Sequence, residues 1–148
     1  MEGKVLAISR SKEKGTVKEE IPVGEFIEGF GLKDDAHGGD WHRQVSLLGI
    51  NSINKLRAEV KDYELNFGDF AENITTEGLV LYELPIGTRM KLGNDVILEV
   101  TQIGKKCHHD CLIYKKIGKC IMPIEGIFTR VIKGGIVKPG DKISLLEN

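Results

Sequence analysis

The amino-acid sequence predicts a mainly β fold, a small barrel that is closed or partly open and carries one or two short helices. Several short stretches alternate apolar with polar residues, which is the spacing of half-buried strands. Turn-forming Gly, Pro and Asn residues separate these stretches, and only one stretch has clear helical spacing. The 148 residues suit one compact domain, so residues 1–148 are expected to form a single unit.

The first half of the chain is expected to contain a hairpin, a third strand and the helix. Ile53, Leu56 and Val60 recur at helical spacing behind a possible capping pair, Asn51-Ser52, so we expect a helix that ends before Asp62. A charged, Gly-ended stretch between the first two strands has the composition of a surface turn. The strands expected in this half cover residues 5–9, 17–23 and 45–50.

The second half is expected to consist mainly of strands with turns between them. Apolar and polar residues alternate on both sides of Gly93-Asn94, and this is the clearest hairpin of the sequence. Gly134-Gly135 is expected to form another tight turn. Residues 67–78, in contrast, have the composition of a loop. The strands expected here cover residues 79–84, 88–92, 96–100, 126–133 and 142–146, which gives seven or eight strands in total.

The composition argues against several classes of protein. A formal net charge of -1 provides no general attraction for a phosphate backbone, so nucleic acid is not expected as a partner. The apolar stretches are too short to cross a bilayer, so no membrane partner is expected, and the N-terminus has no pattern of a secretory signal. We therefore expect a cytoplasmic protein whose three cysteines stay reduced as thiols.

Cys107 is the strongest candidate for a reactive group. Two lysines precede it and two histidines follow it, namely Lys105, Lys106, His108 and His109. Positive charge near a thiol lowers its pKa and favours the thiolate, which is the nucleophilic form. The sequence therefore predicts that Cys107 is reactive near neutral pH.

The other two cysteines have more than one explanation. Cys111 and Cys120 could resolve a persulfide or a disulfide on Cys107 by thiol exchange. Cys120 has apolar neighbours and could equally be a small buried core residue. The spacing from Cys107 to Cys111, with Cys120 and His108 nearby, also fits a zinc site, although no second close pair completes the ligand set.

The first of two polar loops, residues 34–44, offers donors for an anionic ligand. It places His37, His42 and Arg43 among glycines, which let the backbone approach a ligand closely. The alternative is a solvated surface loop whose polar groups only satisfy its own backbone. Composition alone leaves both explanations open.

The second polar loop, residues 68–78, could line a polar pocket with Glu72, Asn73 and Thr75. The alternative is a structural turn, because Asn and Thr are frequent in turns for local hydrogen-bonding reasons. By itself this segment therefore predicts no function.

Four ordered blocks of the sequence resemble the MOSC family, named for the molybdenum cofactor sulfurase C-terminal domain. They span nearly the whole chain at matching separations, and their order is more specific than any single block. Cys107 occupies the position of the family's cysteine. The blocks are Asp35 to Leu48, Gly68 to Thr75, Lys106-Cys107, and Arg130-Val131 through Gly134-Gly135 to Gly140-Asp141.

The resemblance implies a short stand-alone member with a β-barrel similar to the small domain of pyruvate kinase. It implies that Cys107 carries sulfane sulfur as a persulfide to molybdenum cofactor or a related metal-sulfur centre, a sulfurtransferase-type activity. A cysteine desulfurase would be the donor, and a molybdenum-cofactor enzyme or biosynthesis protein the acceptor. The motif positions expected to bind the cofactor are His37, His42, Arg43, Glu72, Asn73, Thr75 and Lys105.

The resemblance also leaves other functions open. Some similar proteins are reductases of N-hydroxylated compounds, in which Cys107 would ligate molybdenum directly through its soft thiolate. Molybdenum ion and pyridoxal phosphate binding are further attributes that the family resemblance implies. A third alternative is a non-catalytic binding module stabilised by zinc, with Cys111, Cys120 and His108 as possible ligands.

Overall fold

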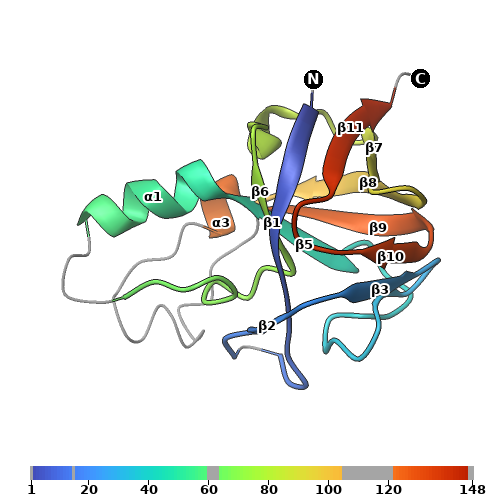
Figure 1. The fold of residues 1–148 in the computed structure, drawn as a ribbon, viewed down its shortest axis with the longest axis horizontal. Coiled ribbons are helices and arrows are strands. Elements are labelled where there is room, and N and C mark those ends of the chain that lie inside the picture. Colours follow the sequence, from blue (N-terminus) through green and yellow to red (C-terminus); the bar gives the residue numbers. More distant parts are fainter. Residues whose placement is uncertain (1, 15, 60–63, 105–121, 147–148) are drawn as a thin grey trace.

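A closed barrel of seven strands forms the body of the protein (Figure 1). The computed structural model describes residues 2–14, 16–59, 64–104 and 122–146. β5 and β6 are parallel, and the other neighbouring pairs in the ring are antiparallel, so the sheet is mixed. In pairing order the strands are β1 (Glu2–Arg10), β11 (Lys142–Leu146), β7 (Arg89–Leu92), β8 (Val96–Ile103), β9 (Ile127–Lys133), β5 (Val45–Gly49) and β6 (Ile74–Glu77), which pairs with β1.

The interior of the barrel is an apolar core. On β7, for example, Met90 and Leu92 are buried whereas Arg89 and Lys91 are exposed, which is the period of two expected for a half-buried strand. Each fully buried aliphatic side chain stabilises the fold by about 1.5–3 kcal/mol relative to an exposed one. The core includes Val5, Ile8, Val45, Leu47, Ile74, Met90, Leu92, Val96, Leu98, Val100, Ile127, Val131 and Ile143.

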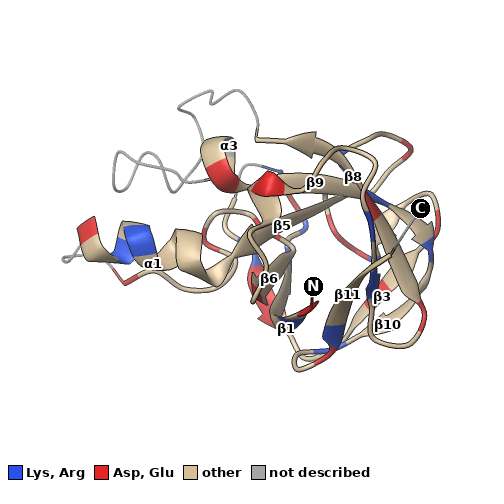
Figure 2. Ribbon diagram, turned by 90° about the horizontal axis from the view of Figure 1, so that it is seen from above, with Lys and Arg blue, Asp and Glu red and all other residues tan. Residues whose placement is uncertain are grey.

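The helix α1 (Ile50–Glu59) makes the parallel strand pair possible. It connects β5 to β6, and parallel neighbours need a crossover of this kind. Its buried residues Ile53 and Leu56 belong to a second apolar cluster with Leu48, Phe70 and Met122. Figure 2 shows α1 projecting from one side of the barrel, away from β3 and β10. Within the described ranges, no helix is long and apolar enough to span a membrane.

Shorter elements surround the barrel. β2 (Glu19–Ile21) pairs with β1 beyond the ring. A separate three-stranded sheet contains β10 (Gly135–Val137), β3 (Gly24–Ile27) and β4 (Gly31–Leu32). The 3-10 helix η1 (Leu81–Glu83) follows β6, and the four-residue helix α3 (Met122–Glu125) precedes β9.

The structure confirms the mainly β barrel, both expected hairpins and the position of the helix. The helix ends at Glu59, and Val60 lies outside the described residues. The prediction of a loop over residues 67–78 is wrong for its last part, because residues 74–77 form β6. Thr75 and Thr76 are buried there between β1 and β5, so the strand shows no apolar alternation.

Three further expectations need correction. Residues 79–84 do not form a strand, because Leu84 N donates to Leu81 O (3.0 Å) and both leucines turn inward from η1. The tight turn expected at Gly134-Gly135 does not join a hairpin, because the strand that follows, β10, pairs with β3. Gly134 instead allows a close approach to β3, where a Cβ would lie only 2.5 Å from Phe26 O. Residues 17–23 hold only the short strand β2.

A buried carboxylate closes the loop that precedes β6. Glu72 has no exposed surface, and its oxygens accept hydrogen bonds from Gly68 N (3.0 Å), Phe70 N (3.1 Å) and Thr75 Oγ1 (3.1 Å). Burial raises the pKa of Glu72 to about 7, although these hydrogen bonds act in the opposite direction. The group is therefore near its titration midpoint at neutral pH.

Glu72 is expected to make the protein less stable as the pH rises. An unfolded glutamate loses its proton near pH 4.3, whereas Glu72 in the fold holds it until about 7, so the stabilisation present in acid is lost across this window. Glu72→Gln removes the titration, and its free energy of unfolding should rise relative to wild type by roughly 2–3 kcal/mol between pH 5 and pH 8. Urea unfolding at both pH values measures this; an equal difference at the two would contradict it.

Candidate functional site

A buried ion pair holds the polar loop of residues 34–44 against the barrel. Lys18 Nζ lies 2.8 Å from Asp35 Oδ1, and neither side chain has exposed surface. Asp35 also accepts hydrogen bonds from the backbone N of Ser11 (3.0 Å) and of His37 (3.1 Å). The carboxylate thus joins the β1–β2 hairpin to the loop through both its charge and its hydrogen bonds.

Lys18 also influences the charge of its neighbours. Burial alone would raise the pKa of Asp35, but the charge of Lys18 and the hydrogen bonds from Lys18 and Ser11 outweigh burial and lower it. Lys18 Nζ lies 3.0 Å from His37 Nδ1 and 3.1 Å from Ser11 Oγ. Because an ammonium group only donates, Nδ1 of His37 accepts, and Nε2 carries the hydrogen in the neutral ring.

Glycines allow the loop to pack closely on the turn before it. A Cβ at Gly38 would lie 2.4 Å from the ring of Phe30, so a larger residue here would displace that ring. Gly39 has a φ of 153° and donates its N–H to Phe30 O at 2.8 Å. Gly38 and Gly39 thus let the chain pack on Phe30 just before Trp41, which is two residues beyond Gly39.

Cationic side chains gather around Trp41. Lys14 Nζ lies 4.8 Å and the Arg43 guanidinium carbon 4.6 Å from the centre of the Trp41 ring system, within the range of cation–π attraction. Trp41 Nε1 donates to His37 O (2.8 Å). The rings of His37 and Trp41 are nearly parallel, and their centres are 6.5 Å apart. We call Lys14, His37, Trp41, His42 and Arg43 the cationic cluster.

Arg43 has a donor without a partner. Its guanidinium also lies over the ring of Phe128, 5.5 Å from the ring centre. Nε of Arg43 is buried and has no hydrogen-bond partner in the described part of the chain. A buried donor of this kind is costly, and an arginine donor is well suited to an anionic ligand.

The cationic cluster is linked to the end of β8. His42 Nε2 donates to Gln102 Oε1 (2.8 Å), and Gln102 Nε2 donates to Gly104 O (2.7 Å). Thr101 Oγ1 also donates to the backbone O of His42. Gly104 N in turn donates to Gly126 O (2.7 Å), so the described residues on either side of segment 105–121 lie together. The cluster therefore adjoins the point where that segment begins.

The structure brings together only part of the expected site. His37, His42 and Arg43 belong to the cationic cluster, in which the His37 side chain is 23% exposed. Glu72, Asn73 and Thr75 have no more than 1% exposed surface, so they do not line an open pocket. The remaining expected residues, Lys105, Cys107, His108, Cys111 and Cys120, lie outside the described residues, and their assignment stays a prediction.

Asn73 has a structural role in this arrangement. Its Oδ1 accepts from Ser46 N (3.0 Å) and its Nδ2 donates to Ser9 O (3.1 Å), which links β5 to β1. Glu72 likewise bonds to Gly68, Phe70 and Thr75 inside the protein. The polar side chains of the second loop therefore stabilise the fold next to the candidate site and do not line an open pocket.

Sequence reasoning missed Lys18 and Lys14. Lys18 directly precedes the short strand β2, and no local pattern distinguishes it from its exposed neighbours Glu19 and Glu20. Lys14 lies in a stretch interpreted only as a charged turn. A metal site formed by three or more His, Cys, Asp or Glu side chains is absent from the residues that the structure describes.

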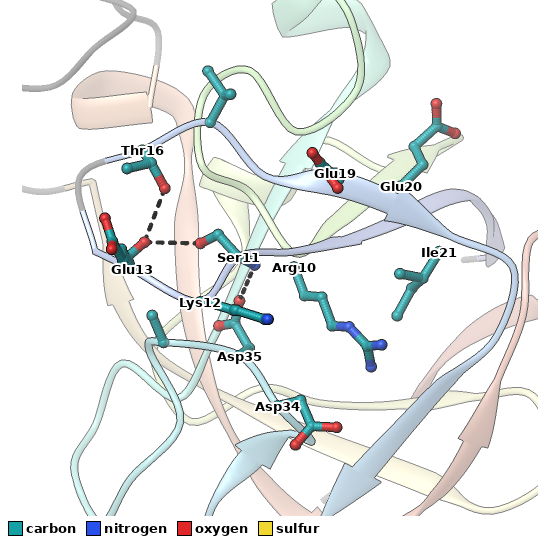
Figure 3. Close-up of a pocket in the computed structure, with 12 residues that line it drawn as sticks. Arg10, Ser11, Lys12, Glu13, Thr16, Glu19, Glu20, Ile21, Asp34 and Asp35 are labelled. Carbon is teal, nitrogen blue, oxygen red and sulfur yellow. Dashed lines mark hydrogen bonds between the residues drawn. The ribbon is translucent and has the colours of Figure 1, made fainter.

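Two hollows adjoin the site. The larger, of about 740 Å³, lies between the β1–β2 hairpin and residues 34–36 (Figure 3). Cations and carboxylates both line it, namely Arg10, Lys12, Glu13, Glu19, Glu20 and Asp34. The smaller, of about 440 Å³, is bordered by Trp41, His42, Gln44 and Arg130. Two members of the cationic cluster, Trp41 and His42, therefore border the smaller hollow.

Solved structures share this fold. The YuaD protein from Bacillus subtilis matches with a TM-score of 0.79 and 19% identity, over 97% of this chain and 94% of its own. YiiM from Escherichia coli matches with a TM-score of 0.73 and 16% identity, over 100% of this chain and 71% of its own. YiiM from Geobacillus stearothermophilus gives 0.75 and 18%, over 98% and 75%. At these identities the likeness shows the fold.

The family is shown by the sequence match. No curated protein matches the chain. The family model described as the MOSC domain matches residues 33–144, which include the loop of residues 34–44 and the strands β5 to β10. Because this match covers well over half of the sequence, the chain belongs to the MOSC domain family.

Proposed function

We propose that this MOSC domain protein is a cytoplasmic sulfur carrier. In this proposal Cys107 takes sulfane sulfur from a cysteine desulfurase and delivers it to molybdenum cofactor, held by a molybdenum-cofactor enzyme or biosynthesis protein. The observation that carries the proposal is the connection of the cationic cluster, through His42 and Gln102, to Gly104. Cys107 follows Gly104 by three residues, which limits the distance between their Cα atoms to about 11 Å.

The cationic cluster supports the chemistry that a sulfur carrier needs. The attacking form of cysteine is the thiolate, and a nearby positive charge stabilises that anion relative to the thiol. Lys14 and Arg43 supply two such charges, and Lys105 and Lys106 add two more in the sequence. A persulfide is also anionic near neutral pH and would gain from the same charges.

The transfer proceeds by exchange between thiols and persulfides. The Cys107 thiolate attacks the outer sulfur of the donor persulfide, the S–S bond of the donor breaks, and the donor leaves as a thiolate. A second thiol, for which Cys111 and Cys120 are the candidates, then attacks Sγ of Cys107. A disulfide forms and sulfide leaves, so the two electrons that reduce the sulfane sulfur come from the two thiols.

Molybdenum cofactor fits the cationic cluster as an anionic substrate. It carries a phosphate group, and phosphate is a favoured partner for an arginine donor. Arg43 Nε is buried and has no partner in the described residues, so a bound phosphate would relieve that cost. We assign Arg43 and Lys14 to the phosphate, and His37 and His42 to the border of the same site.

Metal analysis of the purified protein separates this proposal from its two alternatives. Stoichiometric molybdenum with a pterin chromophore would instead support a reductase of N-hydroxylated compounds. Zinc that survives dialysis, and that is lost when Cys111 and Cys120 are replaced, would support a zinc-stabilised binding module. The carrier is expected to be isolated with neither metal in stoichiometric amount.

Sulfur loading tests the carrier role directly. After incubation with a cysteine desulfurase and cysteine, we expect peptide mass spectrometry to find one added sulfur atom on Cys107, and none in Cys107→Ala. Cys111→Ala is the matched control and should load normally, because the proposal gives Cys111 a part only in release. Absence of sulfur on Cys107, or equal loading of the Cys107→Ala protein, would reject the carrier role.

Cofactor binding tests the role of Arg43. The chain contains one tryptophan, so fluorescence of Trp41 reports the cationic cluster alone. Arg43→Gln removes a charged donor and should weaken binding of molybdenum cofactor roughly tenfold or more, because a hydrogen bond to a charged group is worth about 1.5–3 kcal/mol. Arg89→Gln, at an exposed β7 residue that is likewise paired with Glu99 but borders neither hollow, is the control and should leave affinity unchanged.

Two results would count against this assignment of Arg43. One is equal affinity of wild type and Arg43→Gln for molybdenum cofactor. The other is displacement of the cofactor by pyridoxal phosphate at equal affinity, since the site would then recognise a phosphate without selecting molybdenum cofactor.

A further inference from the structure

The inward side of the loop of residues 66–73 is in direct contact with the backbone of Lys18. Gly68 O accepts a hydrogen bond from Lys18 N at 2.8 Å. Gly68 has a φ of 91°, and a Cβ at this position would lie 2.2 Å from Lys18 O and 3.1 Å from Ser9 Cβ. Because the two backbones touch with no intervening side chain, a shift of Gly68 must displace Lys18 or break this hydrogen bond.

Glu72 determines the position of Gly68. Its carboxylate accepts the N–H groups of Gly68 (3.0 Å) and Phe70 (3.1 Å), so one buried side chain holds both ends of a tight turn. The turn includes Ala71 at a φ of 63°, a region that is unfavourable for a residue with a Cβ. The bonds to Glu72 therefore stabilise a backbone shape that local preference opposes.

At its far end, Lys18 holds the cationic cluster in place. Its ammonium group contacts Asp35 (2.8 Å) and His37 Nδ1 (3.0 Å), and the backbone O of His37 accepts the indole N–H of Trp41 (2.8 Å). A continuous series of short contacts thus runs from Glu72 through Gly68 and Lys18 to Trp41.

From these contacts we infer that Glu72 is a positioning residue of the site: through Gly68 it sets where Lys18 meets Asp35 and His37, and its protonation shifts the cationic cluster. The ionised carboxylate can accept from all three of its donors, whereas the protonated form carries its own hydrogen and has less capacity to accept. As a statement about sulfur transfer this rests on the proposed function; as a statement about position it does not.

Glu72 changes its protonation state near neutral pH, because burial raises its pKa to about 7. Ionisable groups on the neighbouring elements are Asp69, whose carboxylate accepts from Asn66 N (2.8 Å), and Lys18, whose ammonium group contacts Asp35 and His37. The hydroxyl of Thr75 donates to Glu72 Oε2 and favours the ionised form.

The indole N–H of Trp41 provides a direct test, because one tryptophan gives one indole resonance in a ¹H–¹⁵N NMR spectrum. In wild type we expect this resonance to shift with pH, with a midpoint near 7. The ionisable rings of His37 and His42 also lie beside Trp41 and are present in every variant, so each variant is compared with wild type by difference. Glu72→Gln should remove the part of the shift that has its midpoint near 7 and that Glu72 causes. Thr75→Val removes a hydrogen bond that favours the ionised form of Glu72. The pH-dependent shift of the indole resonance should therefore persist in this variant, with its midpoint about half a pH unit higher.

Asp69→Asn is the matched control, since it neutralises a carboxylate of the same loop that accepts from Asn66 N and not from Gly68 N, and it should leave the midpoint unchanged. Identical indole titration curves in wild type and Glu72→Gln, or a midpoint that Thr75→Val leaves in place, would overturn the inference. The pH profile of sulfur loading on Cys107 then separates the two proposals. Loss of loading at every pH with the indole step intact would reject the proposed function alone.

Discussion

The buried ion pair between Lys18 and Asp35 is the interaction on which the candidate site depends. Burying two charges costs solvation, and the pair tolerates this because Ser11 and His37 donate further hydrogen bonds to the carboxylate. Loss of one member would leave a buried charge uncompensated, at a cost of about 3–5 kcal/mol. The pair thus holds the loop of residues 34–44, which carries Trp41 and Arg43 of the cationic cluster.

Two groups of polar residues serve this site in different ways. Arg43, Trp41 and His42 lie next to the end of β8, which is where we propose that the ligand binds. Glu72 and Asn73 are fully buried and bind the protein's own main chain. The residues expected at motif positions therefore include buried residues that shape the loop as well as residues that are partly exposed, and only the folded structure distinguishes the two groups.

The barrel could be predicted because most of its strands have local patterns. β7 and β8 alternate inward and outward residues around a Gly-Asn turn, but β6 is short and buried with polar threonines, so its sequence resembles a loop. Loop composition and family resemblance singled out His37, His42 and Arg43, which the structure brings together around Trp41, while their role in binding stays a prediction. Lys18 could not, because its partner Asp35 is 17 residues away and only the tertiary fold brings the two together.

We propose that the cationic cluster keeps the Cys107 thiol ionised near neutral pH. The most direct measurement is the pH dependence of alkylation at Cys107, resolved from Cys111 and Cys120 by peptide mass spectrometry. The account predicts a midpoint clearly below the value of about 8.5 for an unperturbed cysteine, and a higher midpoint in Arg43→Gln. A midpoint at or above about 8.5 in the wild-type protein, unaffected by Arg43→Gln, would contradict the account.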